Sequence, residues 1–137
     1  MEGFVFKNNE EEYILSEENL TYVDNEDIDG FEIDEVIELL HEGKEKVDFD
    51  YEYYVGACDE CKGGTSIDGK NYRFLEYHFY IFTKNNKYVI SNISDKFENT
   101  SYDQLFRNGE IDDSYIVSIL VCQQCKKYNI AIEQCDM

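Results

Sequence analysis

Four of the five cysteines in this 137-residue chain form two Cys-x-x-Cys pairs. The first pair is Cys58 and Cys61, and the second is Cys122 and Cys125. A tetrahedral zinc ion takes four ligands, and a two-residue spacer allows one tight turn to supply two thiolates at a bond length of about 2.3 Å. The sequence therefore predicts a metal centre with these four cysteines as its ligands. A closed site of this kind supports structure and leaves no open position for catalysis.

The long separation of the two pairs constrains the fold. Pairs of zinc-binding cysteines are commonly separated by about 15–20 residues, whereas 60 residues lie between Cys61 and Cys122. A sheet must therefore bring the pairs together. The second pair lies between the apolar segment 114–121 and an alternating segment that starts at Tyr128. This pattern predicts that the second pair occupies the tip of a β-hairpin.

The arrangement resembles the zinc ribbon, a family recognised by two Cys-x-x-Cys knuckles on β-hairpins, and the resemblance covers about the last 80 residues. It implies a structural zinc ion at Cys58, Cys61, Cys122 and Cys125. Zinc ribbons often serve in transcription and translation machinery, so the resemblance also implies a role of that kind. The chain is similar, too, to uncharacterised small acidic bacterial proteins, and that similarity implies no function.

Other interpretations of the cysteines stay open at the level of the sequence. Iron in a rubredoxin-like site would use the same four thiolates. Disulfides would need an oxidising compartment, and buried thiols could pack as small apolar side chains. A redox-active pair needs a thiol of low pKa, typically at a helix N-terminus, and neither pair begins a predicted helix. Cys135 has no cysteine at a paired spacing and is predicted to be a free thiol.

Acidic residues dominate the first part of the chain. The formal net charge is −19, and residues 1–57 hold 19 acidic and 3 basic residues. Nucleic acid is therefore a poor partner, because its phosphates would be repelled. The acidity favours fast association with a basic protein, and solubility alone is the alternative explanation. No apolar run approaches the length of a membrane span, and the first residues lack the features of a signal peptide, so we expect a cytoplasmic protein.

The hydrophobic pattern predicts one α+β domain over residues 1–137, with an acidic part at 1–57 and a zinc-knuckle sheet at 58–137. An antiparallel β-sheet of about six strands accompanies one main helix. The helix is predicted at 32–42 from apolar residues at helical spacing, and Gly43 is predicted to end it in a left-handed conformation.

Strands are predicted at 12–15, 20–23, 47–57, 71–93 as a hairpin turning at 84–87, 114–121 and 128–132. In the strand 47–57, alternation predicts that Val47, Phe49, Tyr51 and Tyr53 point inward. Ser101 is predicted to cap a short helix that ends near Gly109.

Three functions follow from these observations. The first is a small cytoplasmic interaction or regulatory protein, stabilised by zinc, that binds a basic protein partner as an immunity protein or inhibitor would. The second is a nucleic-acid or transcription-linked zinc ribbon, which needs a basic patch built from Lys62, Lys70, Arg73, Lys126 and Lys127. The third is an iron-binding redox protein or an enzyme that uses His78 with Glu76. We expect no enzyme, since the phosphate-loop, zinc-protease and serine-hydrolase motifs are absent.

Overall fold

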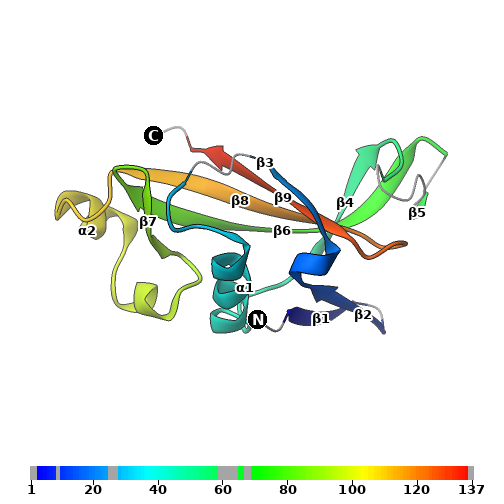
Figure 1. Cartoon of the computed structure of the whole chain (residues 1–137), viewed down its shortest axis with the longest axis horizontal. Coiled ribbons are helices and arrows are strands. Elements are labelled where there is room, and N and C mark those ends of the chain that lie inside the picture. The colour runs from blue at the N-terminus through cyan, green and yellow to red at the C-terminus, as the bar shows by residue number, and fades with distance from the viewer. Residues whose placement is uncertain (1–2, 9, 25–27, 59–64, 67–68, 136–137) are drawn as a thin grey trace.

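The computed structural model describes residues 3–8, 10–24, 28–58, 65–66 and 69–135, and these form an α+β protein made mostly of strands (Figure 1). In chain order, the elements are β1 (Phe4–Asn8), β2 (Glu11–Leu15), the 3-10 turn η1 (Glu17–Asn19), β3 (Leu20–Asp24), α1 (Ile33–Glu42), β4 (Asp50–Val55), β5 (Thr65–Ser66), β6 (Asn71–Lys84), β7 (Lys87–Ser91), the 3-10 turn η2 (Asp95–Asn99), α2 (Tyr102–Arg107), β8 (Asp113–Cys122) and β9 (Tyr128–Gln134).

The main sheet has the strand order β3-β9-β8-β6-β4, with β5 and β7 also paired to the long strand β6. Segment 114–121 is confirmed as a central strand, because β8 lies between β6 and β9. The sheet is mixed and not wholly antiparallel, since β3 pairs in parallel with β9. The segments 12–15 and 20–23 are both strands, yet they pair with different partners, because β2 forms a separate two-stranded sheet with β1.

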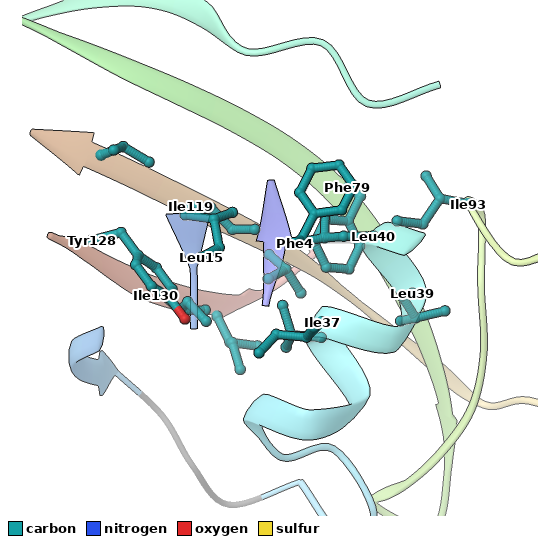
Figure 2. Packing of buried hydrophobic residues seen from close by; sticks show 14 of the residues in the cluster. Phe4, Leu15, Ile37, Leu39, Leu40, Phe79, Ile93, Ile119, Tyr128 and Ile130 are labelled. Carbon is teal, nitrogen blue, oxygen red and sulfur yellow. The ribbon is translucent and has the colours of Figure 1, made fainter. Parts of the chain in front are cut away.

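One face of the main sheet carries the core. Helix α1 and the β1–β2 hairpin lie on that face (Figure 1), and Ile37 and Leu40 of α1 point toward Phe79 and Ile119 of the sheet (Figure 2). The predicted helix at 32–42 is confirmed at Ile33–Glu42, because its apolar residues repeat at helical spacing and are buried together. Two acidic residues lie in the first turn, where their carboxylates interact favourably with the positive end of the helix dipole.

Turn chemistry explains two further elements. Asn85 and Asn86 have φ values of 52° and 66°, as a type I′ turn requires, and they join β6 to β7 as the sequence predicts. Ser101 caps α2, because its hydroxyl oxygen accepts a hydrogen bond of 3.2 Å from the backbone N–H of Gln104.

Two further details of the prediction were wrong. Gly43 has a φ of −98°, so it is not left-handed, and a Cβ there would lie 2.7 Å from the carbonyl oxygen of Ile93. Glycine is therefore needed for close approach and not for backbone conformation. In the segment 47–57 Phe49 is buried and Val47 is partly buried against the core, as predicted, whereas Tyr51 and Tyr53 are exposed, because β4 lies at the edge of the sheet.

Candidate metal centre

Three cysteines from distant parts of the chain meet beside the ends of β4 and β8. The sulfur atoms of Cys58, Cys122 and Cys125 all lie within 4.8 Å of one another, and the Sγ atoms of Cys58 and Cys125 are 3.9 Å apart. Cys58 follows β4, while Cys122 ends β8 and Cys125 lies in the turn before β9. These two segments meet because β4 and β8 pair with opposite edges of β6, at its N-terminal end.

The spacing of the sulfur atoms fits a tetrahedral metal. Four ligands placed about 2.3 Å from a central ion are separated from each other by about 3.8 Å. The 3.9 Å separation of Cys58 and Cys125 is close to that value and far longer than the 2.05 Å of a disulfide. The four described cysteines are free thiols. Three cysteines near one another could therefore bind a metal.

Local backbone structure points donors at the sulfurs of the second pair. The backbone N–H groups of Gln124 and Cys125 donate to Cys122 Sγ, and that of Lys127 donates to Cys125 Sγ. The backbone N–H of Lys126 donates to the carbonyl oxygen of Cys122 at 2.9 Å, and Lys126 has a φ of 63°. This tight turn aims N–H dipoles at both sulfurs, which favours thiolates and hence metal binding.

Burial and the N–H dipoles act in opposite directions on the pKa of these thiols when no cation is bound. Desolvation raises the pKa of the Cys122 thiol to about 12, although the donated N–H groups act to lower it. Desolvation also raises the pKa of Cys125. A divalent cation at the centre of the cluster would reverse this balance, since a coordinating thiol is deprotonated outright.

The remaining two cysteines differ in position. Cys61, the predicted fourth ligand, lies outside the described residues. Cys135 follows β9, and its backbone N–H donates to the carbonyl oxygen of Ser114 near the start of β8. Cys125 lies at the other end of the β8–β9 hairpin, so Cys135 is remote from the cluster along both strands.

The family model described as "Protein of unknown function (DUF3785)" matches residues 4–137. The chain belongs to this family. No curated protein and no solved structure matches the chain. The match to the DUF3785 family covers nearly the whole chain and supplies no function for the cysteine cluster.

A cavity adjoins the cysteine cluster in this DUF3785 protein. Its volume is about 240 Å³, and it opens on the sheet face away from α1, between Tyr54, Phe74, Leu120 and Cys122. Tyr22 lines it from β3. The sequence predicts no site at Tyr22 or Tyr54, because nothing in the local pattern distinguishes these two tyrosines from those of the core. Their exposure follows from the edge positions of β3 and β4, which composition does not reveal.

His78 takes part in a hydrogen-bond network on the same sheet face. Its Nε2 lies 2.8 Å from Glu76 Oε1, and its Nδ1 lies 2.8 Å from Ser118 Oγ. The hydroxyl of Tyr54 donates to the other carboxylate oxygen of Glu76 at 2.6 Å. His78 and Glu76 do not line the cavity beside the cysteines. The network therefore satisfies a buried carboxylate, and His78 is hydrogen-bonded but exposed.

No helix in the described part of the chain combines the length and apolarity needed to cross a bilayer.

Proposed function

We propose that Cys58, Cys61, Cys122 and Cys125 bind one structural zinc ion. The observation that carries this proposal is the convergence of three sulfur atoms within 4.8 Å from segments about 65 residues apart. Cys61 is three residues from Cys58, so the chain cannot carry its Cα farther than about 11 Å from the Cα of Cys58. It is therefore within range to complete the tetrahedron.

The proposed role of the metal is structural. Four thiolates close the coordination sphere, so no position is left for water or substrate. The ion would link the end of β4 to the tip of the β8–β9 hairpin, as the ion of a zinc ribbon links its two Cys-x-x-Cys knuckles. A closed site of four thiolates is typical of zinc, and iron is the alternative occupant. Thiolate ligands need a compartment in which cysteines stay reduced, and the interior of a cell is such a compartment, so we propose a cytoplasmic location.

The second part of the proposal is that this is an interaction or regulatory protein whose partner is a basic protein. The support is the crowding of carboxylates on α1, which contributes exposed acidic residues beside the acidic β1–β2 hairpin. Burial raises the pKa of Glu35, and repulsion by Glu38 and Glu42 raises it further. This repulsion opposes folding. A basic partner would relieve it and would be attracted over a distance before contact.

The nucleic-acid alternative has less support. Its basic patch would need side chains free to meet phosphate, yet Arg73 donates to Gln123 at 3.0 Å and Lys126 pairs with Glu11 at 3.0 Å. The acidic hairpin thus lies against part of the proposed patch, and it would repel a nucleic-acid backbone.

Metal analysis tests the first part of the proposal. Protein made without added metal should contain one zinc ion per chain by mass spectrometry of the intact protein and by elemental analysis. Iron in equal amount would change the metal and keep the site. A folded protein with no metal and with reactive thiols at all four positions would contradict the proposal.

Association kinetics test the second part. Once a partner is isolated by cross-linking, its association rate should fall as salt rises from 0.05 to 0.3 M, because screening removes long-range attraction. Replacing Glu10, Glu11 and Glu12 with glutamine should also slow association. If neither salt nor these substitutions change the association rate, the acidic surface serves only to interact with solvent and does not bind the partner.

A further inference from the structure

Strand β4 is the last strand on one side of the main sheet in the part of the chain that the structure describes. In the strand path β3-β9-β8-β6-β4 it is the last member, and among the described strands only β6 pairs with it. All six of its residues, Asp50–Val55, are exposed. It lies at the end of the sheet away from α2 (Figure 1).

The pairing register shows which main-chain groups face outward. The backbone N–H of Gly56 donates to the carbonyl oxygen of Lys70 at 2.9 Å, so this position bonds toward β6. Bonding direction alternates along an antiparallel strand. Tyr54 therefore also bonds toward β6, while the N–H and C=O groups of Tyr53 and Val55 face away from the sheet. The β4–β6 register has no shift, so this edge is regular.

Strand β4 lacks two of the devices that block strand addition at a sheet edge. Natural sheets protect an edge with charged side chains, proline or a bulge; β4 contains no proline and no bulge, and its charged side chains, Asp50 and Glu52, would repel an acidic strand and attract a basic one. It also presents apolar surface. Tyr53 is 56% exposed and Val55 is 85% exposed. An exposed, regular and apolar edge is a site to which another strand can add.

Side chains on the two faces of β4 specify the chemistry of such a strand. Asp50 and Glu52 lie on the face away from α1, and neither forms an ion pair with any described residue. Arg73 lies on the opposite face over the ring of Tyr51, at 4.2 Å from its centroid. Unneutralised carboxylates on one face favour Lys or Arg opposite them. The tyrosine face favours apolar or aromatic residues.

We propose that β4 binds an extended segment of the basic protein partner, added to the sheet as a strand with alternating basic and apolar side chains. This inference rests on the proposed function and names the contact surface. A second copy of this chain is the less favoured occupant, because two molecules of charge −19 repel each other.

Peptide binding to the full-length protein tests the proposal. The probe is an eight-residue peptide that alternates lysine and valine, and the control is its form with a methyl group on every backbone nitrogen, which keeps the charge but has no N–H to donate to the edge of β4. Amide chemical shifts of the isotope-labelled protein map the site. The lysine–valine peptide should shift and protect the amides of Tyr51, Tyr53 and Val55, and it should bind more tightly than the control by about tenfold or more.

Variants separate main-chain pairing from charge. Tyr53→Pro removes an outward N–H without removing a bond to β6 and should weaken the lysine–valine peptide about tenfold, whereas Tyr53→Thr keeps the N–H and should weaken it less. The pair Asp50→Asn with Glu52→Gln should weaken binding more than Glu17→Gln with Glu18→Gln, which removes equal charge elsewhere.

Each contrary outcome has a distinct meaning. Equal binding of both peptides, with shifts on α1, would keep a basic partner and overturn the role of β4. Binding of neither peptide would overturn both proposals. A dimer in sedimentation that Tyr53→Pro dissociates would make a second copy the occupant and would overturn the basic segment. If Tyr53→Pro does not fold, the shift map of the unsubstituted protein decides the matter.

Discussion

Removing the metal should cost several kcal/mol of folding stability. A cross-link between Cys58 and Cys122 closes a loop of about 65 residues, and the chain-entropy relation gives about 4 kcal/mol for a permanent link of that length. A metal ion differs from a permanent link, because it dissociates when the chain unfolds. It then stabilises the folded state by mass action, which gives about 4 kcal/mol at a free zinc concentration of 1,000 times the dissociation constant. The two estimates agree on the scale of the effect.

Thermal unfolding in the presence and absence of a chelator measures this loss. For a domain of this size, about 4 kcal/mol corresponds to a fall in the midpoint of about 10–20 °C. Cys122→Ser should lose the metal and show a similar fall, since Cys122 is a buried ligand. Circular dichroism reports the midpoint, and elemental analysis of each variant reports the metal.

Cys135→Ser is the matched control, because it removes a thiol remote from the cluster. We expect unchanged metal content and an unchanged midpoint. Loss of metal in Cys135→Ser would show that the ligand set is wrong. If the chelator leaves the midpoint of the unsubstituted protein unchanged while removing a bound ion, the ion does not support the fold, and the reasoning from loop closure fails.

Three further predictions concern charge and packing. The raised pKa of Glu35 means that this carboxyl keeps its proton to higher pH in the folded state than in the unfolded chain, so the free energy of unfolding falls as pH rises above 4.5. Glu35→Gln should flatten this pH dependence. It should also raise the free energy of unfolding by about 0.5 kcal/mol at pH 7 in urea titrations, because it removes repulsion from Glu38 and Glu42. Equal slopes for both proteins would refute this. Gly43→Ala should destabilise by about 1–3 kcal/mol in the same assay, because its Cβ would lie 2.7 Å from the Ile93 carbonyl oxygen, and a stabilised variant would contradict the structure. No measurable binding to duplex DNA or RNA is expected by fluorescence anisotropy at 0.15 M salt, and micromolar binding that weakens steeply with salt would revive the nucleic-acid alternative.

Local signals in the sequence were sufficient to predict most of the helices and strands. Helix α1 follows from apolar residues at helical spacing, and the β6–β7 hairpin follows from Asn85 and Asn86, which tolerate positive φ. Such signals act between near neighbours in the chain. They do not state which strand pairs with which, so the parallel pairing of β3 with β9 was missed. It depends on the route of the chain around the core, which no local pattern records.

The same distinction holds for the candidate site. The paired spacing identified Cys58, Cys122 and Cys125, because two-residue spacers are a local requirement of metal geometry. The exposure of Tyr51 and Tyr53 was not predicted, because their alternation with acidic residues is also the pattern of a strand with one buried face. Alternation shows that two faces differ, but it cannot show whether a helix covers either face.

Metal removal should make β4 open locally, separately from the centre of the sheet. Val55 ends β4, and Cys58 follows three residues later, so a bound ion would fix the end of a strand that pairs on one side only. Val117 and Ile119 are fully buried on β8, which pairs on both sides. Chelation should therefore speed hydrogen exchange of the Tyr54 amide by at least about tenfold through local opening of β4, a loss of at least about 1.4 kcal/mol. In the metal-free protein Tyr54 should be less protected than Val117 and Ile119, whose amides exchange through global unfolding and speed up with the global loss of stability. Equal protection of both strands in the metal-free protein would show that β4 does not open separately from the rest of the fold. No change at Tyr54 would show that β6 alone holds β4 in place, and an added strand would then bind the metal-free protein as tightly as the metal-bound one.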